Sequence, residues 1–229
     1  LYKVSSVNYD ILHIQHKPIA ERMVEMYPEI EKIYTIHSEV IDLENPIKHE
    51  SILKYIAIRP EIKDHLINNF DIEENNIDII YNPVDNIKFT NKNNINGDYV
   101  LFIGTIDYLR KNTIYDLIEY SKSINKELWL VGENKSDYLN LILENTHVKH
   151  FNATWNVEEF VKNSFETAGI QLGRTTIESW MSGKSSWIYK VDSKGDILSK
   201  EKFDPPSDLE KYYSDNVAEL IKEKYFEML

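Results

Sequence analysis

Short runs of β-branched and aromatic residues alternate with longer segments of helical period along most of this chain. The alternation is typical of βα units, in which each strand of a parallel sheet is followed by a helix that packs against the sheet. It therefore predicts an α/β protein. The strands that we expect are residues 10–15, 32–36, 54–58, 77–81, 99–104, 127–132, 148–152, 168–172 and 186–191.

Apolar residues at helical spacing predict helices between most of these strands. Pro18 and Pro60 stand near the start of two of them, where a helix tolerates the missing N–H of proline. The helices that we expect are residues 19–27, 61–70, 113–123, 136–144, 157–163 and 175–182, with two further helical stretches after residue 206.

One segment interrupts the alternation. Residues 82–98 are rich in Asn, contain Pro and Gly, and have almost no apolar period, which is typical of a linker. We therefore expect two domains with a boundary near residue 92, an organisation that suits a chain of 229 residues. Both are expected to be Rossmann-like with a parallel sheet, the domain over 1–92 incomplete and the domain over 93–229 whole.

Charge and composition exclude several classes of protein. Lys and Arg number 26 against 38 Asp and Glu, a net charge of −12, whereas proteins that spread over nucleic-acid phosphates need a cationic face. No Cys is present, which excludes disulfides and thiolate sites. The apolar runs are far shorter than the ~20 residues that cross a bilayer. We expect a cytoplasmic protein that does not bind nucleic acid.

A first candidate ligand site follows the strand that ends at Ile103. Ligands of open α/β sheets bind beyond the carboxyl ends of the strands. Gly104 stands at this end, where the missing side chain lets a ligand approach the backbone. Thr105 follows, and the cations Arg110 and Lys111 come within seven residues. The pattern predicts a turn that holds an anion.

A second candidate site lies where Gly173 leads directly into a helix that begins with Arg174, Thr175 and Thr176. Free backbone N–H groups, the positive end of the helix dipole and a guanidinium would converge there, as in phosphate sites. Glu178, one turn further on, could accept hydrogen bonds from a ribose diol. Alternatively, Arg174 and Glu178 form an ordinary ion pair on a solvated helix face.

Five segments, in order, resemble motifs of the GT-B-fold glycosyltransferases of family 4, a group of retaining enzymes that use nucleotide sugars. They match a strand with a following His, a helix start, the interdomain hinge, the turn at the donor phosphate and the helix that carries the ribose-binding Glu. The segments are TIHS (35–38), IAIRPEI (56–62), IYNPVD (80–85), FIGTIDYLRK (102–111) and GRTTIESWMSGK (173–184).

The resemblance implies the transfer of a sugar from a nucleoside-diphosphate sugar to a saccharide or lipid-linked saccharide acceptor. It implies surface-polysaccharide or glycoconjugate synthesis, with peripheral association at the inner face of the membrane as one option. It also implies a retaining reaction without a resident cofactor. We find no Asp-x-Asp segment of the kind that grips a divalent cation beside a nucleotide, so we expect metal independence.

Roles for individual residues follow from the same resemblance. His37 would face the cleft and contact the donor sugar or support the departing phosphate, and Arg110 or Lys111 would neutralise the diphosphate. Apart from the resemblance, Trp155 follows the expected strand at 148–152 and is a candidate to stack on a base; in the alternative interpretation it packs at the base of its loop. The donor-binding set that we expect is Gly104, Thr105, Trp155, Gly173, Arg174, Thr175, Thr176 and Glu178.

Two positions differ from the family pattern. Ile170 stands where the family has the first Glu of a pair spaced eight residues apart, and isoleucine cannot bind a sugar hydroxyl. Thr105 replaces the Arg that usually follows the first Gly, so Arg174 is expected to supply the charge. The Ile170 difference favours an alternative, a non-catalytic nucleotide-sugar-binding module. A GT-B sugar-nucleotide epimerase is a further alternative, but it would need more carboxylates around the cleft.

Overall fold

The computed structural model describes residues 9–90 and 97–229. Its contacts divide the chain into two compact units. Unit 1 takes in the described residues up to Asn82 together with Asp215–Leu229, and unit 2 is Pro83–Ser214. The boundary that we predicted near residue 92 lies outside the described residues.

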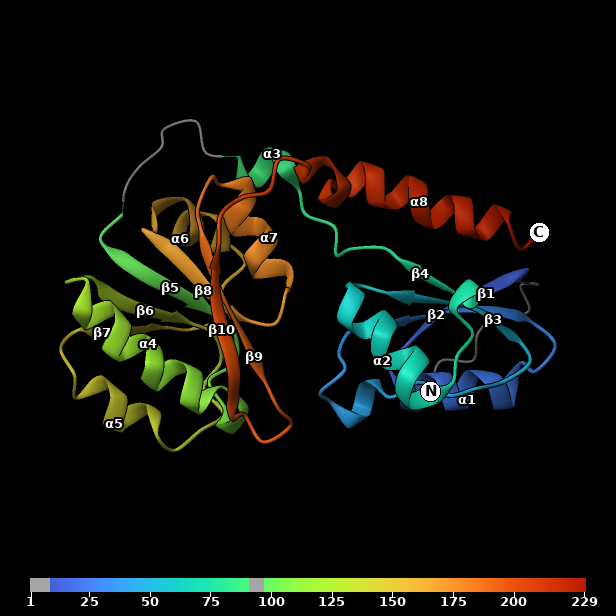
Figure 1. Ribbon diagram of the computed structural model, residues 1–229, viewed down its shortest axis with the longest axis horizontal. Helices are drawn as coiled ribbons and strands as arrows, with labels where there is room; N and C mark the ends of the chain where they lie inside the picture. Colours follow the sequence, from blue (N-terminus) through green and yellow to red (C-terminus); the bar gives the residue numbers. More distant parts are fainter. Residues whose placement is uncertain (1–8, 91–96) are drawn as a thin grey trace. The chain divides into compact units, whose positions relative to one another are not determined.

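Unit 1 is built on a four-stranded parallel sheet with the strands in sequence order. Apolar residues of two helices pack on one face with strand residues such as Tyr34 and Tyr55. A third helix covers the other face (Figure 1). The elements are β1 (Ile11–Gln15), α1 (Lys17–Met26), β2 (Glu31–Ile36), η1 (Asp42–Glu44), β3 (Ile52–Ala57), α2 (Pro60–Phe70), η2 (Glu74–Asn76), β4 (Ile77–Ile79) and α8 (Ser214–Phe226).

The last helix, α8, therefore belongs to the sheet of unit 1, whereas we predicted it within a domain over 93–229. Its Val217 is buried in one cluster with Ile33, Ile56 and Ile80 of that sheet. The Tyr225 hydroxyl of α8 lies 2.6 Å from Nδ1 of His13. The difference has a physical cause, because the apolar stripe of an amphipathic helix goes to whichever sheet face is uncovered.

Unit 2 contains a six-stranded sheet in the order β10-β9-β8-β5-β6-β7, parallel except for β10. Figure 1 shows α4 and α5 on one face and α6 and α7 on the other. The elements are α3 (Asn86–Phe89), β5 (Tyr99–Ile103), η3 (Tyr108–Arg110), α4 (Lys111–Ser123), β6 (Glu127–Val131), α5 (Leu139–Leu143), β7 (Val148–Phe151), α6 (Val157–Asn163), β8 (Glu166–Ile170), α7 (Arg174–Met181), β9 (Ser186–Val191), β10 (Ile197–Phe203) and η4 (Leu209–Tyr212).

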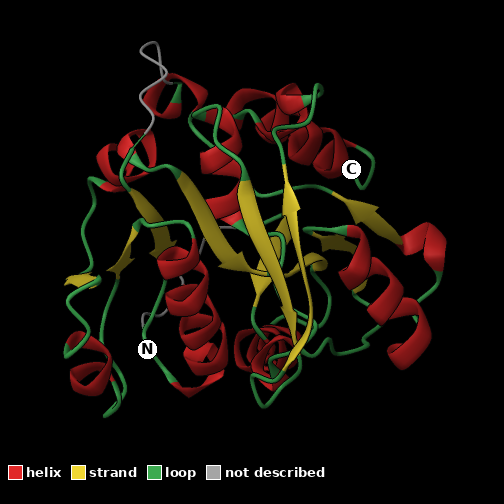
Figure 2. Ribbon diagram, turned by 60° about the vertical axis from the view of Figure 1, so that its left-hand side comes forward, coloured by secondary structure: helices red, strands yellow, loops and turns green. Residues whose placement is uncertain are grey.

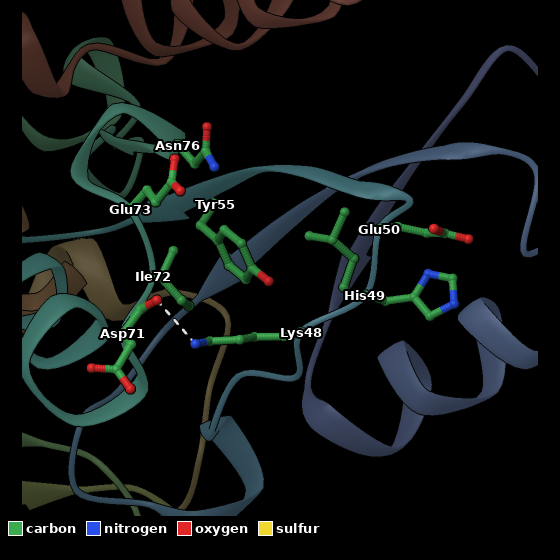
Figure 3. Close-up of a pocket in the computed structure, with 9 residues that line it drawn as sticks. Lys48, His49, Glu50, Tyr55, Asp71, Ile72, Glu73 and Asn76 are labelled. Atoms are coloured by element: carbon green, nitrogen blue, oxygen red, sulfur yellow. Dashed lines mark hydrogen bonds between the residues drawn. The ribbon is translucent and has the colours of Figure 1, made fainter.

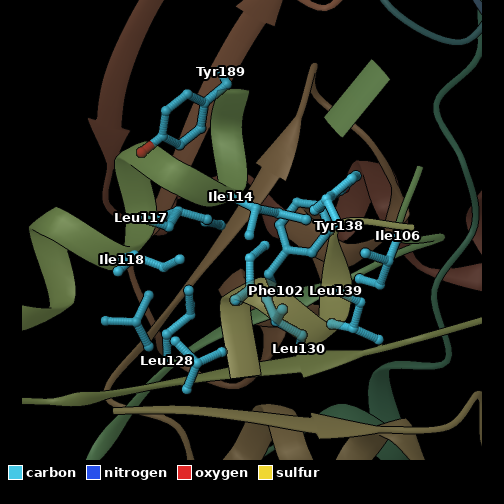
Figure 4. Packing of buried hydrophobic residues seen from close by; sticks show 14 of the residues in the cluster. Phe102, Ile106, Ile114, Leu117, Ile118, Leu128, Leu130, Tyr138, Leu139 and Tyr189 are labelled. Atoms are coloured by element: carbon cyan, nitrogen blue, oxygen red, sulfur yellow. The ribbon is translucent and has the colours of Figure 1, made fainter. Parts of the chain in front are cut away.

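The core of unit 2 lies between its sheet and the helices α4 and α5. Phe102 and Leu130 of the strands are buried there against Ile114 and Leu117 of α4 and Leu139 of α5 (Figure 4). The prediction of an α/β protein with two parallel-dominated sheets is confirmed. Helices flank the strands in both units (Figure 2).

Candidate functional site

Two turns of unit 2 meet at one edge of its sheet. Strands β5 and β8 are hydrogen-bonded neighbours and run parallel, with Phe102 opposite Ala168. Their carboxyl ends therefore lie side by side, and the residues beyond them line one cavity of about 100 Å³. Of the residues singled out from the sequence, those that line it are Gly104, Arg110, Gly173, Arg174, Thr175 and Thr176.

Gly104 and Gly173 place no side chain in this cavity. A Cβ added to Gly173 would meet no atom within 4 Å, and one added to Gly104 would lie 3.5 Å from Nε of Arg110. Gly173 is also the N-cap residue of α7. The backbone N–H groups of the first turn of α7 have no partner within the helix, so they are available to an anion in the cavity.

Thr176 brings an unsatisfied hydroxyl to the cavity. The residue is 1% exposed, and its Oγ1 has no hydrogen-bond partner among the described residues. Buried polar groups in proteins are nearly always paired, so this hydroxyl stands out among the polar groups around the cavity.

Both arginines that line the cavity form ion pairs with carboxylates. Arg110 pairs with Asp107 through its guanidinium, and its backbone N–H also donates to the Asp107 carboxylate, at 3.2 Å. Arg174 donates from Nε to Glu178 Oε1 at 2.8 Å. The side chain of Arg174 is 66% exposed, whereas that of Glu178 is 5% exposed. The predicted ion pair of Arg174 and Glu178 is therefore present, but its carboxylate does not lie on a solvated face.

Burial raises the pKa of the Glu178 carboxyl above its ordinary value of 4.5, and the charge of Glu158 acts in the same direction. Arg174 and, more weakly, Lys88 oppose this rise. Desolvation of the buried carboxyl therefore outweighs its pairing with Arg174.

The raised pKa predicts a pH-dependent effect of Glu178→Gln on stability. A carboxyl that holds its proton more tightly when folded favours folding at low pH, and this contribution is lost as the pH rises above the unfolded value. Glutamine mimics the protonated form at every pH. We expect the melting temperature of the variant, relative to the wild type, to be higher at pH 7 than at pH 4. Thermal unfolding followed by circular dichroism measures it, and an equal difference at both pH values would contradict the prediction.

The segment around Trp155 lies at the start of α6. The Trp155 side chain is 93% exposed, so the ring does not pack at the base of its loop. Lys88 of α3 donates to the Trp155 carbonyl at 3.3 Å and pairs with Glu158 at 3.1 Å. Because Lys88 and Glu158 also act electrostatically on Glu178, these groups share one neighbourhood of unit 2.

Three residues of the predicted donor-binding set do not line the cavity: Thr105, Trp155 and Glu178. Lys111, which was expected to neutralise the diphosphate, does not line it either. Glu178 is connected to the cavity by its hydrogen bond with Arg174, which lines the cavity. The ammonium of Lys111 lies 5.8 Å from the centre of the Tyr138 ring, a cation–π position. Arg110 rather than Lys111 is therefore the cation that the turn after β5 presents to the cavity.

No family model and no curated protein matches the sequence, but solved structures match its fold. A glycosyltransferase from Rickettsia africae matches with a TM-score of 0.67 and 13% identity, over 96% of this chain and 76% of that chain. HepE from Anabaena in complex with UDP-glucose matches with a TM-score of 0.60 and 13% identity, over 95% and 70%. The chain has the GT-B fold. At this identity the likeness concerns the fold, so membership of family 4 stays a prediction.

In this GT-B chain the cavity is also lined by residues that the sequence did not single out as ligands, among them Ile170 and Gln171. Ile170 lines it, at the position where the family pattern has a Glu, and Gln171 follows. Gln171 is 8% exposed and has a left-handed backbone with φ of 59°, a conformation that costs energy for a residue other than glycine. Backbone strain of this kind leaves no mark in a single sequence.

His37 lies in unit 1 of the GT-B chain, directly after β2. Its Nε2 is 3.2 Å from the side-chain oxygen of Gln15, and its backbone N–H donates to Glu44 Oε2 at 3.2 Å. Burial lowers the pKa of the His37 imidazole; Glu44 opposes this and the charges of His16 and Arg59 support it. The expected role of His37 at the donor stays a prediction.

His13 of β1 and His16, which follows that strand, are occupied by contacts within unit 1. His13 lies 2.7 Å from Thr35 Oγ1 as well as contacting Tyr225, and His16 pairs with Glu44. Within residues 9–90 and 97–229, no group of three His, Asp or Glu side chains could hold a metal ion. No helix in those ranges is long and apolar enough to cross a bilayer.

Proposed function

We propose that the chain binds a nucleoside-diphosphate sugar in unit 2 and transfers the sugar to a saccharide acceptor. The observation that carries this proposal is the meeting of two glycine turns at one cavity, with Arg110, Arg174 and Thr176 among the residues that line it. A cavity of about 100 Å³ suits the diphosphate, and the sugar and the nucleoside would extend beyond it.

The same groups would assist bond cleavage. Negative charge grows on the diphosphate as the bond to the sugar breaks, so donors already in place lower the barrier. Arg110, Arg174 and the N–H groups at the start of α7 supply such donors without reorganisation. The departing phosphate would itself take the proton of the acceptor hydroxyl, so no side chain has to act as the base.

Two further residues would recognise the nucleoside. The Glu178 carboxylate, buried and bonded to Arg174 on one side, would accept hydrogen bonds from the ribose diol. The exposed ring of Trp155 would stack on the base, since aromatic rings offer a large face at little entropic cost. Lys88, which holds the Trp155 carbonyl, would keep this segment beside Glu178.

The finer features of the proposal come from the family resemblance. They are a retaining reaction without metal or cofactor, family 4 membership, His37 in contact with the donor sugar, and a role in surface-polysaccharide or glycoconjugate synthesis. A lipid-linked acceptor at the inner membrane face belongs to the same set. HepE with UDP-glucose, and a form of TarM from S. aureus with UDP and alpha-GlcNAc-glycerol, support a nucleotide sugar and a saccharide as partners.

A non-catalytic nucleotide-sugar-binding module is the second candidate, and Ile170 favours it. This residue lines the cavity at the position expected to carry a sugar-binding carboxylate. Gln171 offers an amide at the neighbouring position and would replace part of that contact in an active enzyme. Turnover of a nucleotide sugar by this chain separates the two candidates.

Calorimetric titration of the chain with the 5′-diphosphates of uridine, adenosine, guanosine, cytidine and thymidine tests the proposal. We expect at least one to bind with millimolar or better affinity, and Glu178→Ala to weaken its binding about tenfold, because hydrogen bonds to a charged group are lost. Glu159→Ala is the matched control, since Glu159 is an exposed carboxylate of α6. Absence of binding by all five, or equal binding by the Glu178 variant, would overturn the proposal.

A further inference from the structure

Unit 1 contains a cavity of about 430 Å³, larger than the one at the candidate donor site (Figure 3). It is formed by residues 48–52 before and at the start of β3, and by residues 71–76 before β4. Because β2, β3 and β4 are parallel, it lies at the amino ends of the strands. His37 follows the carboxyl end of β2, at the opposite edge of the same sheet.

The floor of this cavity is apolar. Ile52, Tyr55 and Ile72 line it and are only 4–6% exposed. The Tyr55 hydroxyl donates to the Ile47 carbonyl at 2.7 Å, so its polar atom is already paired and the ring adds carbon surface. Such a floor suits the C–H face of a ligand rather than a second polar network.

The rim carries three exposed carboxylates, those of Glu50, Asp71 and Glu73. Among the residues that the structure describes, these carboxylates make no hydrogen bond or ion pair to another side chain. Figure 3 shows Glu73 beside Asn76 on one side of the cavity and Glu50 on the other. The rim therefore offers several acceptors of hydrogen bonds.

The rim also offers donors. The Lys48 ammonium donates to the Asp71 carbonyl at 2.9 Å (Figure 3) and has further N–H groups to give. His49 Nδ1 accepts from the Ser51 backbone N–H at 3.2 Å and lies 2.8 Å from its hydroxyl. That hydroxyl oxygen accepts from the buried Lys32 ammonium at 2.9 Å. His49 Nδ1 is therefore engaged with Ser51.

This combination selects one class of ligand. An anion would use Lys48 but would be repelled by three carboxylates, and an ammonium ligand would use the carboxylates but leave the Lys48 donor unmatched. A hydroxyl group donates one hydrogen bond and accepts others, and a sugar ring adds an apolar C–H face. We propose that this cavity binds a neutral saccharide. The cavity is wide open to solvent, so it would cover one face of a sugar ring and leave the other face exposed.

The saccharide site is independent of the proposed function. It belongs to unit 1, uses none of the residues assigned to the nucleotide, and would bind sugar with no nucleotide present. In a transferase it would anchor a sugar chain away from the reacting end. In a chain that binds no nucleotide it would still hold a saccharide, so the two proposals fail separately.

Saturation-transfer NMR on the whole chain, without nucleotide, tests the site with glucose, galactose, N-acetylglucosamine and maltotriose. We expect at least one to bind with about millimolar affinity. The double variant Glu73→Ala/Asn76→Ala removes a carboxylate and an amide from the rim and should weaken that binding about tenfold or more. The control is Glu74→Ala, because Glu74 neighbours Glu73 but pairs with Lys63, 3.0 Å away, and does not line the cavity.

Glucose 6-phosphate and putrescine serve as the charged probes in the same experiment. Weaker binding of both than of the best neutral sugar supports the proposal. Binding of putrescine but of no sugar overturns it, as does binding of no sugar at all. Equal weakening in the double variant and in Glu74→Ala also overturns it, because the sugar would then lie elsewhere.

Discussion

Replacing Arg110 and Arg174 together by alanine is expected to weaken the binding of a nucleoside diphosphate at least a hundredfold. Each guanidinium lines the cavity where the two glycine turns meet, and a hydrogen bond to a charged group contributes about 1.5–3 kcal/mol. Since 1.4 kcal/mol is a factor of ten in affinity, losing both removes two or more factors of ten. Calorimetric titration of the wild type, the single variants and the double variant measures the effect.

Two controls accompany this experiment. Lys111→Ala removes the cation next in sequence, which lies over Tyr138 rather than at the cavity, and should change affinity less than threefold. The nucleoside without phosphates should bind the Arg110→Ala variant as it binds the wild type, because Arg110 pairs with Asp107 and not with Glu178. A double variant that retains diphosphate affinity, or a Lys111 variant that loses as much, would show that the phosphates lie elsewhere.

Gly132→Ala is expected to lower the free energy of unfolding by about 3 kcal/mol or more. A Cβ on Gly132 would lie 1.9 Å from the carbonyl oxygen of Gly104, and this neighbour is backbone that cannot swing away. Gly132 also joins two strand ends, because its N–H donates to the Phe151 carbonyl at 3.0 Å. Unfolding by urea measures the loss, and the shift of the Gly104 turn should also weaken diphosphate binding.

Gly173→Ala is the matched control for Gly132→Ala. The added Cβ meets nothing within 4 Å, so only the N-cap preference changes, at a cost below about 1 kcal/mol. If the two alanine variants lost equal stability, the close approach of Gly132 to Gly104 would not be the cause.

The sequence predicted the buried parallel strands well because burial on both faces leaves continuous runs of apolar and β-branched residues. The strand at 186–191 and the helix at 157–163 match residue for residue. Strand β10 escaped prediction because it is an exposed edge strand of mixed Lys and Glu, held only by β9. Charged residues on an edge strand prevent further pairing, and in a single sequence they resemble a loop.

The Asn-rich segment illustrates a second limit. Short helix α3 begins inside it, with Asp85 accepting from the Lys88 N–H and Phe89 buried at its end. Val84 pairs with Tyr213 at the other end of unit 2. Composition suggested a linker across the whole segment because two buried apolar residues leave no periodic pattern. The boundary between the two units depends on contacts of this kind, between residues that are far apart in the sequence.

For the candidate site, the rule that ligands bind at the carboxyl ends of strands was enough to bring Gly104 and Gly173 to one cavity. This rule does not say in which direction a side chain points. Arg110 and Lys111 are adjacent in sequence, yet only Arg110 lines the cavity. The orphaned Thr176 hydroxyl and the left-handed Gln171 depend on packing around the site, and no spacing of residues predicts them.

The return of α8 to the first sheet has a consequence for how the protein is made. Ile33, Ile56 and Ile80 leave the ribosome early, but Val217, which shares their cluster, is translated only after all of unit 2. Unit 2 has its complete set of strands while the nascent chain is still growing, and domains generally fold as units during synthesis. The sheet of unit 1 is therefore translated before that of unit 2 but is fully covered only later. Until α8 has been made, one apolar face of this sheet is exposed on the nascent chain, and a chaperone would bind there.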